Sequence, residues 1–260
     1  MQTPDSTLSI DLIASLIKSK SFSKNLIFAD STPSTNTKAW DMINNGATSG
    51  IILTDEQLNG KGQRGRKWVF QKTKSIAFSI FTSHKIDSNK IGYLPSLCAL
   101  SVKNALNHFN ISASLKWPND IFLNGKKIGG ILCESKINKG RSKNIIMGIG
   151  INVNQDNDDI KSLNILNAGS LRSEYGKMFK REEIISTIIN NLEPLLMQFP
   201  ENYKSIKYSW EKSCFHLNQI VELSTNSKKI KGIFKGLGIN GCAIIEKNGN
   251  SINASSGIIT

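Results

Sequence analysis

The chain has 260 residues, of which 39% are hydrophobic and 20% charged, as in globular proteins and unlike disordered or fibrous chains. No apolar run reaches the roughly 18 residues that a membrane span needs, and no signal peptide is recognised. The formal net charge is +13, and residues 61–150 alone hold 16 Lys+Arg against 3 Asp+Glu. An AT-rich codon bias would spread lysine evenly, so this concentration favours an anionic ligand or an acidic partner.

Apolar periodicity and turn residues predict elements in both halves of the chain. The N-terminal half is expected to contain an amphipathic helix over 8–17, strands over 26–28, 50–54 and 75–81, helices over 37–45 and 94–109, and a polar loop over 59–67. A hairpin is expected within 115–134, because the dipeptide Asn124-Gly125 is flanked by alternating apolar residues. Further expected elements are a strand over 145–153, helices over 163–176 and 181–199, and short strands over 220–223, 229–234 and 242–246.

This pattern predicts an α+β domain over residues 1–213 and a small β-barrel over residues 214–260. The four cysteines, Cys98, Cys133, Cys214 and Cys242, show no paired spacing and sit among apolar neighbours. Reduced, buried thiols have this distribution, so a cytoplasmic location is expected.

The segment Gly60-Lys61-Gly62-Gln63-Arg64-Gly65-Arg66-Lys67-Trp68 is the first candidate site. Its glycines let the backbone approach a ligand, its basic side chains suit phosphate or carboxylate, and Trp68 offers a face to a planar base. A phosphate-binding P-loop is excluded because the Gly-Lys-Ser/Thr ending is missing. The alternative is a solvated basic linker.

The second candidate site is the hairpin that follows Lys116-Trp117-Pro118-Asn119-Asp120. A two-residue turn at Asn124-Gly125 predicts that Phe122 faces Lys127 and that Asp120 faces Gly129. Alternation then puts Lys116, Asp120, Phe122 and Lys127 on one face, with a hollow at Gly129. These groups suit a metal–nucleotide and a carboxylate; the alternative is an ordinary cross-strand ion pair.

The third candidate is Gly148-Ile149-Gly150-Ile151-Asn152. Glycines inside a strand indicate that another group approaches closely, and Asn152 could bind a base or ribose edge. An ordinary strand is an equally good interpretation of this motif alone.

Together these motifs, with Ser34-Thr35-Asn36 and Lys127-Ile128-Gly129-Gly130, resemble the biotin protein ligases, which attach biotin to a lysine of a carboxylase carrier. The resemblance covers roughly residues 26–260. It implies a mixed β-sheet with helices, of the class II synthetase-like biotin/lipoate ligase type, followed by an SH3-like barrel. It also implies two steps: biotin and Mg-ATP form biotinyl-5'-AMP, and the carrier lysine then displaces AMP.

The resemblance implies a role for each matching position. Biotin would be bound by Ser34, Thr35, Asn36, Gln57, Lys61, Gly62, Gln63, Lys127, Gly129 and Gly130. The nucleotide would be bound by Arg64, Arg66, Trp68, Asn119, Gly148, Gly150 and Asn152. Lys127, Asp120 and Arg64 would be catalytic, and Asn119 and Asp120 would hold Mg²⁺.

Two features depart from the family pattern. Lys61 and Gln63 replace the first two arginines of a loop that usually reads Gly-Arg-Gly-Arg-Arg-Gly-Arg. About 33 residues precede Ser34, fewer than the roughly 60 of a winged helix-turn-helix, so a monofunctional ligase without specific DNA binding is expected. An acidic carrier protein or domain is the expected partner, and a homodimer stays open. The rivals are a lipoate or octanoate ligase or transferase and, from another class, a nucleic-acid-binding protein.

Overall fold

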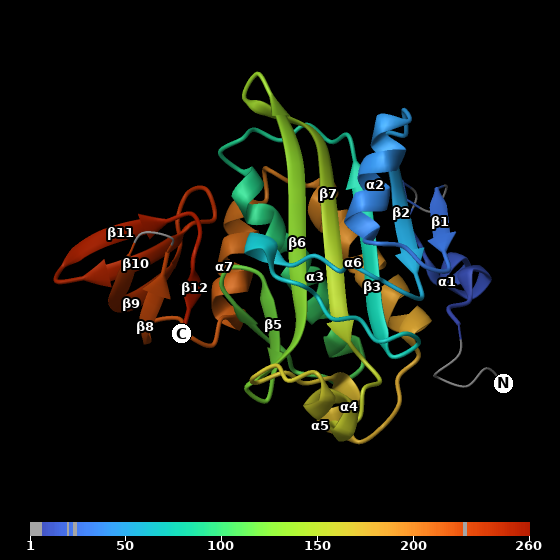
Figure 1. The fold of residues 1–260 in the computed structure, drawn as a ribbon. Coiled ribbons are helices and arrows are strands. Elements are labelled where there is room, and N and C mark those ends of the chain that lie inside the picture. Colours follow the sequence, from blue (N-terminus) through green and yellow to red (C-terminus); the bar gives the residue numbers. More distant parts are fainter. Residues whose placement is uncertain (1–6, 20, 23–24, 226–227) are drawn as a thin grey trace.

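A computed structural model describes residues 7–19, 21–22, 25–225 and 228–260 (Figure 1). Its larger sheet has seven strands, in the spatial order β1 (Leu26–Ala29), β2 (Ser49–Thr54), β3 (Ser75–Thr82), β7 (Arg141–Asn152), β6 (Lys126–Asn138), β5 (Asp120–Leu123) and β4 (Ser114–Lys116). Strands β1 and β2 pair in parallel, whereas all the other neighbours in this sheet are antiparallel. The sheet is therefore mixed, as expected.

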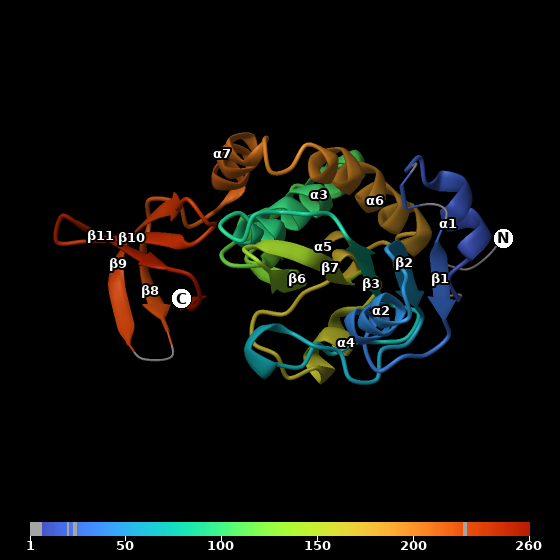
Figure 2. The same cartoon turned by 90° about the horizontal axis from the view of Figure 1, so that it is seen from above.

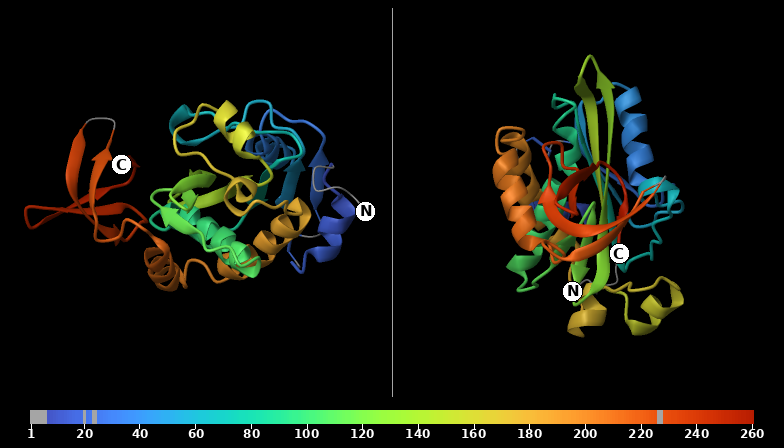
Figure 3. Two further views of the ribbon diagram at one scale, coloured as in Figure 1. Left: turned by 90° about the horizontal axis from the view of Figure 1, so that it is seen from below. Right: turned by 90° about the vertical axis from the view of Figure 1, so that its left-hand side faces the viewer.

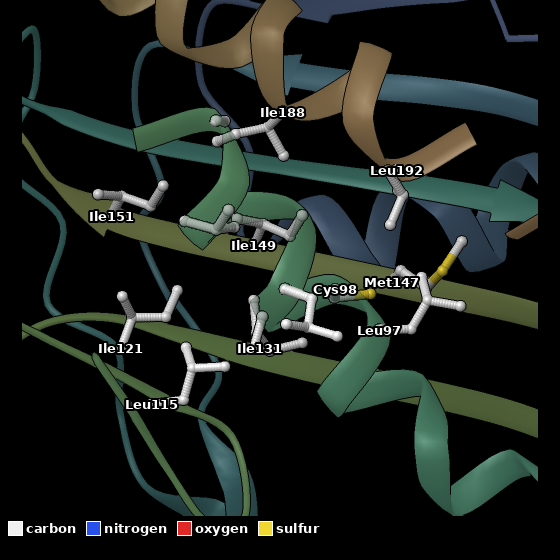
Figure 4. Packing of buried hydrophobic residues seen from close by; sticks show 14 of the residues in the cluster. Leu97, Cys98, Leu115, Ile121, Ile131, Met147, Ile149, Ile151, Ile188 and Leu192 are labelled. Atoms are coloured by element: carbon white, nitrogen blue, oxygen red, sulfur yellow. The ribbon is translucent and has the colours of Figure 1, made fainter. Parts of the chain in front are cut away.

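Helices cover both faces of this sheet unequally (Figure 2). One face carries α1 (Ile10–Leu16), α3 (Leu94–His108), α6 (Arg181–Met197) and α7 (Tyr203–Ser213), and the other carries α2 (Thr35–Asn44). The main core lies on the first face, where Leu97 and Cys98 of α3 and Ile188 and Leu192 of α6 lie over strands β5 to β7 (Figure 4). On the second face, α2 packs against β2, β3 and β7.

The C-terminal segment forms a second, five-stranded antiparallel sheet (Figure 3). Its strands lie in the order β11 (Asn250–Ala254), β10 (Ala243–Lys247), β9 (Lys229–Leu237), β8 (Ile220–Ser224) and β12 (Ile258–Ile259). The indole nitrogen of Trp117 donates to the carbonyl of Gly241 at 3.2 Å, which ties this sheet to the segment between β4 and β5. The expected SH3-like module is confirmed as a separate sheet.

Most of the predicted helices and strands are confirmed, but one predicted helix is not. The helix expected over 163–176 is wrong: α4 (Asn157–Ser162) and α5 (Leu171–Tyr175) are short helices, separated by a loop. Each has a capping box, at Asp156 and at Ser170, because Asp and Ser side chains bind free N–H groups at helix starts. In the part of the chain that the structure describes, no helix is long and apolar enough to cross a membrane.

Candidate functional site

A cavity opens on the α2 side of the large sheet and runs across the strands from β3 and β7 to β4. It is lined by Ser34, Thr35, Asn36, Gln57, Lys61, Gly62, Gln63, Arg64, Arg66, Lys67, Trp68, Ala77, Lys116, Trp117, Pro118, Asn119, Asp120, Lys127, Gly130, Ile131, Leu132, Gly148, Ile149, Gly150, Gly257, Ile258 and Ile259. All the site residues expected from sequence lie in this lining except Gly129 and Asn152. The three candidate segments therefore form one site.

One end of the cavity is uncharged and rich in hydrogen-bonding groups. Helix α2 begins at Thr35, earlier than expected, and Ser34 occupies its N-cap position without a side-chain capping bond. The Ser34 hydroxyl is therefore available to the cavity, although the residue is only 3% exposed. Gln57 Oε1 accepts from the Thr35 backbone N–H at 3.1 Å. This end suits a neutral polar group.

Glycines of β7 form the floor of the cavity because larger residues would not fit. A Cβ at position 148 would lie 2.3 Å from Oδ1 of Asn36, and a Cβ at position 150 would lie 2.7 Å from the ring of Trp68. The expectation that another group approaches this strand is confirmed for both glycines. Trp68 also lies over Gly130, and its indole N–H is buried without a partner among the described residues. A ligand oxygen would satisfy that donor.

We expect Gly150→Ala to displace Trp68, because the added methyl group meets the indole ring at 2.7 Å. The KM for the nucleotide should rise by about tenfold, or about 1.4 kcal/mol, if Trp68 stacks on its base. Gly130→Ala is the matched control, since its Cβ would meet Trp68 at an ordinary 3.7 Å. Steady-state kinetics check this, and equal effects of the two substitutions would contradict the role of Trp68.

The opposite end of the cavity is cationic. Lys127 Nζ lies 2.6 Å from Oδ1 of Asp120, so the predicted proximity of the two side chains is confirmed. Lys116, directly opposite Asp120 in the β4–β5 ladder, also lines the cavity. Burial lowers the pKa of Lys116 from its ordinary value; Asp120 opposes this shift, and Lys127 adds to it. An anionic ligand would relieve the repulsion between the two lysines.

The predicted register of the hairpin is wrong by one residue near the site. Asp120 pairs with Gly130 rather than Gly129, because the ladder shifts between Ile121 and Phe122. Phe122 still faces Lys127, as expected. The shift turns Gly129 to the core face, where a Cβ would contact Ile121, and leaves Gly130 as the hollow beside Asp120. A bulge of this kind re-aims side chains at a site.

The glycine-rich loop folds over the cavity. Its ends are joined by backbone bonds from Trp68 N to Gly60 O at 2.8 Å and from Gly62 N to Arg66 O at 2.7 Å. Arg64 has a φ of 59°, and its Nη2 donates to Ser256 Oγ at 3.3 Å. Among the described residues, no carboxylate pairs with the basic side chains of this loop, Lys61, Arg64, Arg66 and Lys67.

Asn152 and Asn119 differ in what they can offer a ligand. The Asn152 amide, expected at a nucleotide, is buried outside the cavity lining and donates to Gly169 O at 2.9 Å. The Asn119 amide nitrogen donates to Ile131 O at 2.6 Å, so its Oδ1 stays available. Within the described residues, no three His, Cys, Asp or Glu side chains form a metal cluster. Asp120 and Asn119 could serve Mg²⁺ only together with phosphate oxygens.

Sequence reasoning left several lining residues out. Lys116 had been placed on the correct face by strand alternation, but without a role. Ser79 lies behind the cavity on β3, and it gave no local signal because a single serine among apolar strand residues does not reveal its hydrogen-bond partners. Gly257 to Ile259 line the cavity from the C-terminal sheet, and only the packing of the two sheets could reveal this contact.

Comparisons with known proteins show the family to which the chain is similar. A model of the biotin/lipoate A/B protein ligase family matches residues 28–152. The bifunctional ligase/repressor BirA of Bacillus spizizenii is 30% identical over 233 residues, covering 88% of this chain and 72% of that protein. The biotin–[acetyl-CoA-carboxylase] ligase of Paracoccus denitrificans is 26% identical, covering 82% of this chain and 91% of its own. The Aquifex aeolicus biotin protein ligase in complex with biotin and ATP superposes with a TM-score of 0.74 at 31% identity, covering 91% of this chain and 98% of that one.

Proposed function

The chain belongs to the biotin protein ligases of the biotin/lipoate A/B protein ligase family, and from this premise we propose that it joins biotin to a lysine of a carboxyl carrier protein. ATP activates the biotin through biotinyl-5'-AMP. The main observation that supports this proposal is that one cavity connects a neutral hydrogen-bonding end to a cationic end at Lys127. Biotin has a matching neutral ureido head and a carboxylate at the end of its chain.

In the first step, the biotin carboxylate attacks the α-phosphorus of ATP and pyrophosphate leaves. Ser34, Thr35 and Gln57 hold the ureido head, which sets the carboxylate toward Lys127. Lys127 offsets the charge of the carboxylate and of the α-phosphate as they approach. Arg64 and Arg66 of the loop, with no carboxylate partner among the described residues, bind phosphate oxygens, and Trp68 contacts the base.

In the second step, the amine of the carrier lysine attacks the carbonyl carbon of the mixed anhydride and AMP leaves. The attacking nitrogen loses a proton, and Asp120 lies at the cationic end, where its carboxylate can accept it or orient the amine. The side chain already accepts from Lys127, so Lys127 fixes its orientation. No enzyme nucleophile is needed, because the anhydride is itself reactive.

Magnesium enters this proposal with the nucleotide. Mg²⁺ supplies charge neutralisation of the phosphates, and the residues that would contact it are Asp120 and Asn119. Both line the cavity, and one carboxylate with one amide oxygen is a donor set that Mg²⁺ uses beside substrate phosphates.

The cationic loop and cavity end also favour an acidic carrier, and the four free cysteines favour a reducing, cytoplasmic location. We place the domain boundary between residues 213 and 214, where α7 ends and the segment leading to β8 of the second sheet begins. Specific DNA binding is not part of the proposal, because part of the basic cluster over residues 61–150 lines a cavity of small-molecule size: Lys61, Arg64, Arg66, Lys67, Lys116 and Lys127.

ATP–pyrophosphate exchange tests the function. Exchange is expected with biotin and not with lipoate or octanoate, because an alkyl chain offers nothing to the neutral polar end. Exchange supported by octanoate as well as biotin would instead favour the lipoate or octanoate branch of the family.

We expect the loop over 59–67 to resist trypsin when biotin and ATP are both present. Arg64 is exposed, and holding three glycines in place costs roughly 1–2 kcal/mol per residue in backbone entropy, which bound anions offset. Closure would also shield the anhydride from water. Mass spectrometry should show slower cleavage after Arg64 and Arg66, but unchanged cleavage after Arg141, at the far hairpin. Equal cleavage after Arg64 with and without ligands would contradict closure.

A further inference from the structure

We infer that Ser79, a buried serine behind the cavity, takes the hydroxyl proton of Thr35, so that Thr35 can only accept a hydrogen bond from a ligand. The neutral end of the site therefore selects a ligand N–H group. The inference rests on the proposed function and deepens it. Ser79 lies on β3, is fully buried, and does not belong to the cavity lining. Its hydroxyl lies 2.6 Å from Oδ1 of Asn36 and 2.7 Å from Oγ1 of Thr35. Ser79 is therefore a positioning residue that acts through Thr35.

The orientation of the Asn36 amide anchors this chain of hydrogen bonds. Its Nδ2 lies 3.2 Å from the carbonyl oxygen of Leu132, which can only accept a hydrogen bond. The amide nitrogen must therefore face Leu132, and Oδ1 must face Ser79. Gly148 makes room for this arrangement, since a Cβ there would lie 2.3 Å from Oδ1.

The direction of each hydrogen bond follows from the number of protons on Ser79, Thr35 and Asn36 Oδ1. The Ser79 hydroxyl has one proton, and Asn36 Oδ1 has none, so Ser79 must donate to Asn36. The contact of 2.7 Å between Ser79 and Thr35 then needs the proton of Thr35, because two oxygens at that distance without a hydrogen repel each other. The competing acceptor for that proton, Gln57 Oε1, is farther away at 3.3 Å. It already accepts from the Thr35 N–H.

Thr35 Oγ1 is left with only lone pairs for the cavity, so a bound ligand must donate to it. Gln57 has its oxygen occupied and its Nε2 left to donate, so the ligand must also present an acceptor. A urea carries an N–H beside a carbonyl oxygen and satisfies both. A cyclic carbamate has a ring oxygen in place of that N–H, so the lone pairs of this oxygen would face the lone pairs of Thr35 Oγ1 and repel them.

The test compares biotin with its two cyclic carbamate analogues, in which one or the other ureido N–H is replaced by oxygen. For the wild type, we expect kcat/KM in ATP–pyrophosphate exchange to fall by about 30-fold for the analogue whose oxygen meets Thr35, about the penalty of an unmade buried hydrogen bond. In Ser79→Ala, the Thr35 hydroxyl is free to rotate and donate. The ratio of kcat/KM for biotin to kcat/KM for this analogue should therefore fall below about fivefold. The change should appear in KM, with kcat for biotin retained.

Two further variants separate this role from a structural one. Ser101→Ala removes another fully buried hydroxyl, which donates to Cys98 O within α3, and should keep the full ratio. Ser79→Thr retains the hydroxyl, so this variant should also keep the full ratio. An unchanged ratio in folded Ser79→Ala overturns the inference, as does a wild type that accepts biotin and both carbamates equally. A wild type without biotin-dependent exchange would instead contradict the proposed function.

Discussion

Lys127→Ala is expected to slow formation of biotinyl-adenylate by about 100-fold, the effect of removing one group that stabilises developing charge. In the proposed first step, Lys127 is the cation that faces both reacting anions, and in the structure its Nζ lies 2.6 Å from Oδ1 of Asp120. Its loss would leave the Asp120 carboxylate uncompensated beside the incoming carboxylate and phosphate. Single-turnover measurement of adenylate formation checks the result.

Lys126→Ala is the matched control for this substitution. Lys126 is the adjacent residue on β6, but its ammonium pairs with Glu174 at 2.8 Å and does not line the cavity. Its removal should leave the rate within about twofold, since surface ion pairs contribute little. A Lys127→Ala enzyme with an unchanged single-turnover rate, or equal losses in both variants, would remove Lys127 from the chemistry.

Arg181→Ala is expected to reduce the free energy of unfolding by about 3–5 kcal/mol, because it leaves a buried carboxylate without its partner. Arg181 Nη2 lies 2.9 Å from Asp55 Oδ1, and the two side chains are 1% and 2% exposed. Asp55 Oδ2 also accepts from the backbone of Leu8 at 2.8 Å, so the pair ties the first helix to the sheet. Urea denaturation followed by circular dichroism measures the change.

Lys161→Ala provides the comparison for Arg181→Ala, because its ion pair with Asp158 is largely exposed. Its effect should stay within about 0.5 kcal/mol. The double variant Asp55→Ala/Arg181→Ala should be less destabilised than the sum of its single variants, since neither charge is then left alone. An additive double variant, or a single variant as stable as Lys161→Ala, would contradict a strongly coupled buried pair. Neither residue lines the cavity, so the folded Arg181→Ala enzyme should retain its KM for biotin.

Local sequence determined most elements of this protein, as well as the identity of the family. The Asn124-Gly125 turn specifies its hairpin because both residues adopt a positive φ that few other dipeptides tolerate. The motifs around Lys127 and Trp68 consist of contiguous residues, so the chemistry of each could be inferred before their positions in space were known. Where short-range signals were weak, as in the loop between α4 and α5, a continuous helix was predicted wrongly.

The tertiary structure alone decided which of these groups meet and which way they face. A one-residue shift in the β5–β6 ladder exchanged the places of Gly129 and Gly130, because side chains alternate between the faces of a sheet. The burial of Asn152 outside the cavity and the approach of Gly257 to the cavity both depend on packing between segments far apart in the chain. The proton order through Asn36, Ser79 and Thr35 depends on distances of 2.6 and 2.7 Å between α2 and β3. The sequence determined which donors and acceptors are present. Folding determined the direction of the hydrogen bonds between them, because a hydroxyl group can donate either way until its neighbours are in place.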